Sequence, residues 1–157
     1  MLSSDILEQQ FGATKVVIIK QTSGYRIIKT VANTNGQTLE LSLVTFTRNT
    51  ARFPDIHKKI IKGSSIGKAF KQAGVSFVRT VHSITHDPLP PTLQSYFNDT
   101  RLATIVDVDI YVGDDMVHYC HIIEIYSSEV DWPQPKTATN NNDVRSALQH
   151  FSELMSD

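Results

Sequence analysis

The chain has 157 residues, 15 basic and 16 acidic side chains and a net charge of -1. This length suits one domain that buries about two thirds of its unfolded surface, and the balanced charge gives no electrostatic attraction to nucleic acid or anionic lipid. Apolar residues make up 40% of the chain, with only 7 Gly and 6 Pro, which excludes a low-complexity or disordered sequence.

The first half of the chain predicts a helix, three strands and a pair of helices. Ser3 or Ser4 can cap a short helix that Gly12 ends. β-Branched runs separated by turn residues then predict three strands. Pro54 suits the first turn of a helix, and Gly63 separates it from a second one. The expected elements are a helix at 3–11, strands at 16–20, 25–31 and 38–46, and helices at 54–62 and 66–73.

The second half predicts three more strands and a C-terminal helix. β Character resumes until prolines interrupt it, and a helical turn follows. An alternating strand, a turn at Gly113 and a second strand then form a hairpin. A Pro- and Asn-rich loop precedes an amphipathic helix. The expected elements are strands at 75–85, 102–112 and 117–126, a helical turn at 92–97, a loop at 132–142 and a helix at 143–156.

Strands joined mostly by hairpins predict antiparallel pairing. We therefore expect an α+β fold with a single antiparallel β-sheet of about six strands and flanking helices, forming one domain over residues 1–157. The N-terminal residues lack the basic and apolar regions of a signal peptide, and no apolar run is long enough to span a membrane. The single cysteine, Cys120, cannot form an internal disulfide. These features predict a cytoplasmic protein that binds neither membranes nor nucleic acid, and they predict no particular oligomeric state.

Glu124 is the acidic residue with the most apolar surroundings. It lies in the strand His121-Ile-Ile-Glu-Ile-Tyr126 and shares a face with Cys120 and Ile122. A buried carboxylate must find partners or take up a proton, and such carboxyl groups recur in active sites. A strand-edge position that meets water, or a structural hydrogen bond, is the alternative for this residue.

Arg26 begins an apolar strand and shares a face with Ile28. Its guanidinium suits a carboxylate, although a solvated arginine at a strand end is the commoner arrangement. The segment Gly63-Ser-Ser-Ile-Gly67 opens a helix and offers free backbone NH groups, either to an anion or simply to a helix cap.

Four histidines surround the second hairpin, but their spacing matches no known metal site. His118 and Cys120 are expected on one strand face, with His121 on the other. Glycine patterns for nucleotide binding are absent as well. We therefore expect no metal and no cofactor.

In the order of these features, residues 2–130 resemble the chorismate lyase family. Enzymes of this family remove pyruvate from chorismate to leave 4-hydroxybenzoate. Four segments carry the likeness: Leu2-Ser-Ser-Asp-Ile-Leu-Glu, Tyr25-Arg26-Ile-Ile, Ser64-Ser-Ile-Gly67 and His121-Ile-Ile-Glu-Ile-Tyr126. Asp107 and Asp109 depart from the pattern, because basic residues are expected on that strand.

The resemblance implies a cofactor-independent carbon–oxygen lyase whose partner is a small aromatic or enolpyruvyl acid. In this arrangement Arg26 and Glu124 are the catalytic residues: Arg26 pairs with the ligand carboxylate and Glu124 contacts the 4-oxygen of the ring. The remaining substrate-binding residues are expected to be Leu2, Ile28, Ile66, Gly67, Cys120 and Ile122.

Two non-catalytic alternatives share this fold. The fold resembles the effector domains of certain bacterial transcription regulators, which hold small acids without converting them. The second alternative is a carrier or sensor that binds an aromatic acid and acts through a partner chain. Binding of 4-hydroxybenzoate without release of pyruvate from chorismate distinguishes both from the enzyme.

Overall fold

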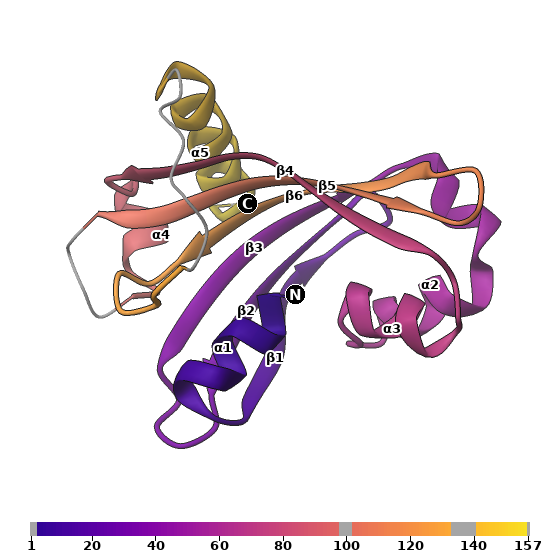
Figure 1. The fold of residues 1–157 in the computed structure, drawn as a ribbon. Helices are drawn as coiled ribbons and strands as arrows, with labels where there is room; N and C mark the ends of the chain where they lie inside the picture. Colours follow the sequence, from indigo (N-terminus) through magenta and orange to yellow (C-terminus); the bar gives the residue numbers. More distant parts are fainter. Residues whose placement is uncertain (1–2, 98–101, 133–140, 157) are drawn as a thin grey trace.

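The computed structural model describes residues 3–97, 102–132 and 141–156 (Figure 1). Its centre is one six-stranded sheet in the order β1-β2-β3-β6-β5-β4, in which all neighbouring strands are antiparallel. The strands are β1 (Thr14–Gln21), β2 (Tyr25–Ala32), β3 (Thr38–Phe46), β4 (Phe77–Asp87), β5 (Ala103–Val112) and β6 (Val117–Tyr126). The helices are α1 (Ser3–Phe11), α2 (Pro54–Ile61), α3 (Ile66–Gln72), α4 (Pro91–Gln94) and α5 (Asn141–Ser156), with a 3-10 helix, η1, at Arg48–Arg52.

Helices cover both faces of the sheet, and each face has its own apolar core (Figure 1). On one face α1, α2 and α3 contribute Leu7, Ile60 and Phe70 to the core. On the other face α4 and α5 contribute Leu93 and Phe151. The period-two alternation of the strands sends successive side chains into these two cores, so the sheet is buried on both sides over much of its area.

The predicted elements are present with small shifts of their ends. The strands at 38–46 and 117–126 have the predicted bounds. The C-terminal helix begins at Asn141, two residues before its predicted start, so the end of the predicted 132–142 loop is helical. Residues 133–140 of that loop lie outside the described residues. None of the described helices combines the length and hydropathy that a membrane span requires.

A β-bulge in β6 corrects the predicted position of His118. Cys120 pairs with Ile110 but His118 pairs with Tyr111, so Tyr119 is the extra residue. A bulge shifts the alternation by one residue, and therefore His118 points to the face opposite Cys120. There it lies on the same side as His121, and Tyr119 turns into the core instead.

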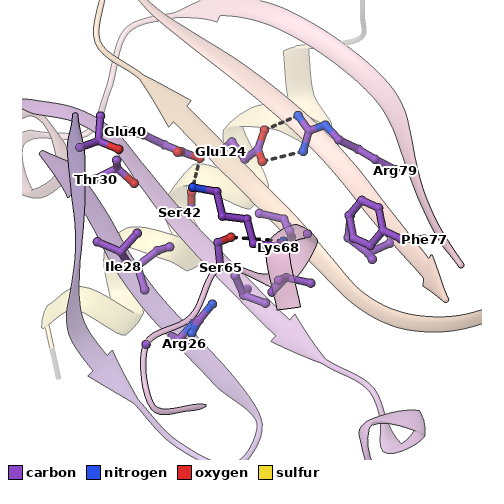
Figure 2. Close-up of a pocket in the computed structure, with 18 of the residues that line it drawn as sticks. Arg26, Ile28, Thr30, Glu40, Ser42, Ser65, Lys68, Phe77, Arg79 and Glu124 are labelled. Atoms are coloured by element: carbon purple, nitrogen blue, oxygen red, sulfur yellow. Dashed lines mark hydrogen bonds and ion pairs between the residues drawn. The ribbon is translucent and has the colours of Figure 1, made fainter. Parts of the chain in front are cut away.

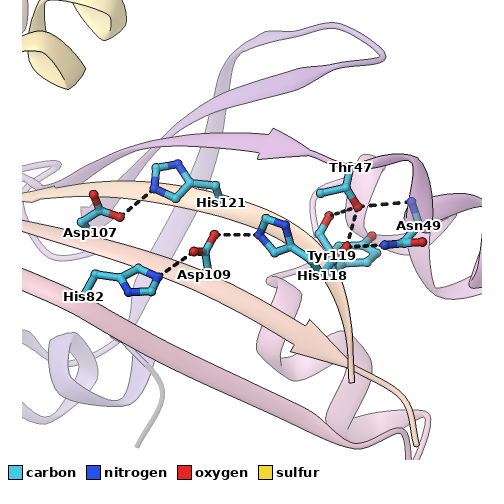
Figure 3. Close-up of polar contacts among 8 residues, drawn as sticks. All are labelled: Thr47, Asn49, His82, Asp107, Asp109, His118, Tyr119 and His121. Atoms are coloured by element: carbon cyan, nitrogen blue, oxygen red, sulfur yellow. Dashed lines mark hydrogen bonds and ion pairs between the residues drawn. The ribbon is translucent and has the colours of Figure 1, made fainter. Parts of the chain in front are cut away.

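The histidines pair with two aspartates of β5 on this second face (Figure 3). Both oxygens of Asp109 are hydrogen-bonded, at 2.6 Å to Nε2 of His82 and at 2.6 Å to Nε2 of His118. Asp107 pairs in the same way with His121, at 2.6 Å. Asp107 and Asp109 therefore lie on the face of the sheet opposite α1 and α3. Their departure from the family pattern, which has basic residues on this strand, does not affect the face that α1 and α3 cover.

Candidate functional site

A cavity of about 280 Å³ opens between the sheet and the helices α1 and α3 (Figure 2). All six strands contribute to its wall, together with the segment that leads into α3. Of the expected site residues, Arg26, Ile28, Ile66, Gly67, Ile122 and Glu124 line it. Leu2 lies outside the described residues.

Cys120 is not part of the cavity wall. It is fully buried one row beyond Ile122, where it pairs with Phe46 in the β3–β6 ladder. Aromatic side chains fill this end of the face, including Tyr119 and Phe70, whose rings make an edge-to-face contact. Burial raises the pKa of the Cys120 thiol. Cys120 is therefore a packing residue beside the pocket, which corrects its expected contact with a ligand.

Arg26 lies at one end of the cavity and is only 1% exposed. Its Nη1 donates a hydrogen bond to the carbonyl oxygen of Ile60 at 2.5 Å, and its Nε has no partner. Among the described residues, no carboxylate forms an ion pair with Arg26. Burial lowers the pKa of the guanidinium, because the charged form loses its hydration. The end of the cavity thus holds a desolvated cation that lacks a counter-ion.

Glu124 lies toward the other end of the cavity and has three hydrogen bonds from two side chains. Arg79 reaches from β4 across β5 and donates Nη1 to Oε2 at 2.7 Å and Nη2 to Oε1 at 2.6 Å. The hydroxyl of Tyr126 donates to Oε1 at 2.9 Å. This bidentate geometry is the strongest that a carboxylate and a guanidinium can form. These three hydrogen bonds hold the Glu124 side chain in a fixed orientation.

Glu40 is a second buried carboxyl group in the same part of the cavity, only 6% exposed. Ser42 donates its hydroxyl to Oε2 of Glu40 at 2.7 Å. Burial, and then the neighbouring charge of Glu124, raise the pKa of Glu40 from its ordinary value of 4.5 to about 8. Glu40 is consequently protonated at neutral pH.

Sequence reasoning singled out neither Arg79 nor Glu40. The alternation of β3 did place Glu40 on one face with Ser42 and Val44, which was the available signal for this residue. Arg79 gave no comparable signal, because its contact with Glu124 depends on the order in which β4, β5 and β6 pair.

The rim of the cavity is formed in part by α1 and α3. Ser65 caps α3 by accepting a hydrogen bond from the backbone NH of Lys68 at 3.4 Å. The Lys68 Nζ lies 3.4 Å from Oε1 of Glu8, and both side chains are nearly half exposed. This ion pair connects the two helices at the mouth. Within the described residues, no cluster of His, Cys, Asp and Glu has the arrangement of a metal site.

No protein-family model matches this sequence, and no curated protein matches it either. Solved structures do share its fold, and they include the following three. A GntR-family transcriptional regulator from Bacillus cereus is 11% identical, with a TM-score of 0.54 over 81% of this chain and 99% of that chain. PhnF from Mycobacterium smegmatis is 12% identical, with a TM-score of 0.60 over 89% of this chain and 69% of that chain. A possible transcriptional regulator, YydK from Bacillus subtilis, is 12% identical, with a TM-score of 0.55 over 80% of this chain and 64% of that chain.

The fold is thus α+β and chorismate lyase-like, in the form found in GntR-type regulators, which confirms the predicted fold class. The expectation of a carbon–oxygen lyase is wrong, because the three solved structures reported above are described as transcriptional regulators. The likeness of this chain to these regulators is one of fold.

Proposed function

We propose that this chain is a non-catalytic domain that binds a small organic acid and passes its occupancy to a regulatory partner. One observation carries the proposal: the guanidinium of Arg26 forms part of the cavity wall, is buried, and has no carboxylate partner in the described chain. A desolvated cation without a counter-ion costs free energy, and a bound anion compensates that cost.

The middle of the cavity suits an apolar body, and its size suits a small one. Ile28 and Val44 face the space from the sheet, and Phe77 faces it from the end of β4. A cavity of about 280 Å³ is slightly smaller than the usual range for ligand pockets, about 300–1,000 Å³. We therefore propose a ligand with an aromatic ring or a short aliphatic body between its polar ends, whose acid group contacts Arg26 and the backbone of Ile66 and Gly67.

The regulators that share the fold support a role in sensing. With a net charge of -1, this chain has no basic surplus for DNA, and we propose that any contact with DNA is made by another domain or chain. The proposed domain comprises residues 1–157. The proposed place of action is the cytoplasm, where an unpaired thiol such as Cys120 stays reduced.

The fluorescence of Trp132 offers a direct binding assay, since it is the single tryptophan of the chain. Its ring stacks on Tyr126 with centroids 4.6 Å apart and lies 5.8 Å from the guanidinium carbon of Arg79. Titration with benzoate and 4-hydroxybenzoate should change this fluorescence and saturate. Arg26→Met should weaken both acids by on the order of 30-fold or more, which corresponds to about 2 kcal/mol.

Arg52→Met is the matched control, because Arg52 is half exposed and pairs with Asp115 away from the cavity. This variant should bind both acids like the wild type. Circular dichroism should show that both proteins are folded. If the wild type and Arg26→Met then bind the acids with equal affinity, Arg26 does not contact the acid group of the ligand.

A further inference from the structure

Six charged side chains line the cavity, three basic and three acidic, but they do not all form ion pairs with one another. They are Arg26, Arg79, Lys68, Glu8, Glu40 and Glu124. Four of them form two ion pairs. Lys68 pairs with Glu8 at the rim, and Arg79 pairs with Glu124 inside the cavity. Among the described residues, this leaves one cation and one acid of the cavity without an ionic partner: Arg26 and Glu40.

These two groups lie at opposite ends of the cavity (Figure 2). Arg26 is paired across the sheet with Val44, whereas Glu40 is paired with Thr30, four residues farther along β2. Four residues of strand span about 13 Å. Ile28, Val44 and Ile122 lie between them, and the Ser42 hydroxyl beside Glu40 is hydrogen-bonded to that carboxyl group. Arg26 and Glu40 therefore do not neutralise each other.

The side chains around Glu40 are three hydroxyl groups, one carboxylate and one guanidinium that pairs with that carboxylate. The groups that face it are Ser42 on its own strand, Glu124 and Tyr126 from β6, Arg79 from β4 and Thr30 from β2. Arg79 donates both of its terminal nitrogens to Glu124. Two buried carboxyl groups thus lie near one guanidinium, whose hydrogen bonds go to Glu124. A second cation at this end would let both carboxyl groups ionise.

We infer that the ligand is an amino acid of the ω type, with an acid group at Arg26, a protonated amine at Glu40 and an apolar spacer between them. This inference rests on the proposed function, since it adds a second polar group to the same bound acid. α-Amino acids do not fit the arrangement, because their charged groups are separated by a single carbon.

The charge change at Glu40 makes binding dependent on pH. Its pKa of about 8 in the empty cavity means that the carboxyl group holds a proton at pH 7. An ammonium group in contact favours the carboxylate, so binding at pH 7 releases this proton. Affinity for the amino acid should therefore rise between pH 6 and pH 8, and affinity for an acid without the amine should not.

The test compares four probes by isothermal titration calorimetry at pH 7: 4-(aminomethyl)benzoate, 4-methylbenzoate, 4-methylbenzylamine and 6-aminohexanoate. The first two differ only in the ammonium group. We expect the wild type to bind 4-(aminomethyl)benzoate about tenfold or more tightly than 4-methylbenzoate, as a hydrogen bond to a charged group is worth this much. Titrations in phosphate and in Tris, whose ionisation enthalpies differ, should reveal about one proton released per amine-bearing ligand.

The variants separate the two ends of the cavity. Glu40→Gln keeps the shape of the protonated side chain and should abolish the preference for the amine, leaving 4-methylbenzoate unaffected. Glu153→Gln is the matched control, because Glu153 is an exposed residue of α5 and lies outside the cavity wall; it should retain the preference. Arg26→Met should weaken both benzoates in the same proportion.

The outcomes distinguish this inference from the proposed function. Equal affinity of the wild type for the two benzoates, or a preference that survives Glu40→Gln, overturns the amine site and leaves the acid-binding function intact. If none of the three acids binds in an Arg26-dependent way, both proposals fail. The comparison of the two benzoates with the wild type remains decisive even if Glu40→Gln does not fold.

Discussion

Arg79 and Glu124 form a bidentate ion pair across three strands, with N–O distances of 2.7 and 2.6 Å. Both side chains are largely buried, with exposed fractions of 13% and 3%. The guanidinium also lies over the ring of Trp132, 5.8 Å from its centroid. This pair fixes the position of both side chains at one end of the cavity.

Loss of Arg79 should destabilise the protein strongly. Arg79→Met leaves two buried carboxyl groups, Glu124 and Glu40, without a cation, and removing one partner of a buried pair costs about 3–5 kcal/mol. Urea unfolding monitored by circular dichroism measures this cost. The double variant Arg79→Met/Glu124→Gln should recover much of it, since no charge is then left unpaired at position 124. If the double variant is less stable than Arg79→Met, the pair is not the source of the cost.

Arg26→Met should stabilise the protein, unlike Arg79→Met. The methionine retains much of the apolar volume, and the buried guanidinium has no counter-ion in the described chain. The carbonyl of Ile60 keeps a hydrogen bond from the backbone NH of Gly63 at 3.0 Å. We expect the free energy of unfolding without ligand to rise by on the order of 1 kcal/mol. A marked loss of stability in the same urea experiment would show that Arg26 serves mainly to hold α2 against the sheet.

Glu40→Gln should change how stability depends on pH. The folded-state pKa of Glu40 is raised to about 8 from an ordinary value of 4.5. Its contribution to stability is therefore fully present below pH 4.5 and is lost as the pH rises through about 8, because the unfolded chain releases the proton first. The variant lacks this loss, so its stability relative to the wild type should grow between pH 5 and pH 8 by on the order of 3 kcal/mol.

Thermal or urea unfolding at several pH values checks this prediction for Glu40. Glu8→Gln is the control from the exposed rim of the same cavity. A difference between Glu40→Gln and the wild type that stays constant from pH 5 to pH 8 would mean that Glu40 is ionised in the folded state.

Cys120→Ala should affect packing without affecting the ligand. The side chain is fully buried and lies outside the cavity wall, so its truncation should cost on the order of 1 kcal/mol of stability. Binding of benzoate should be unchanged. In the wild type the thiol should react with a disulfide reagent only as fast as the protein opens, since burial raises its pKa and shields it. A Cys120 thiol that reacts in the native protein as fast as a free cysteine would contradict this picture.

The sequence alone determined the order of the elements and the faces of most strands. Period-two alternation is a local property, and it placed Glu124 with Ile122 and Arg26 with Ile28. Turn and cap residues such as Gly63 and Ser65 likewise act on their immediate neighbours. The resemblance to a known family added the idea that Arg26 and Glu124 belong to one pocket, and it also led to the wrong expectation of an enzyme.

Tertiary structure decided which residues from distant segments meet. Strand order brings Arg79 to Glu124 and places Glu40 beside them, and neither contact follows from local pattern because strand pairing is set by the packing of the whole sheet. The bulge at Tyr119 turned His118 away from Cys120 and toward Asp109. A β-bulge is an extra residue on one of two paired strands, so it depends on how the strands pair and is not visible in the sequence of one strand. The two ends of the cavity, one with Arg26 and the other with Glu40 beside the Arg79–Glu124 pair, exist only in the folded sheet.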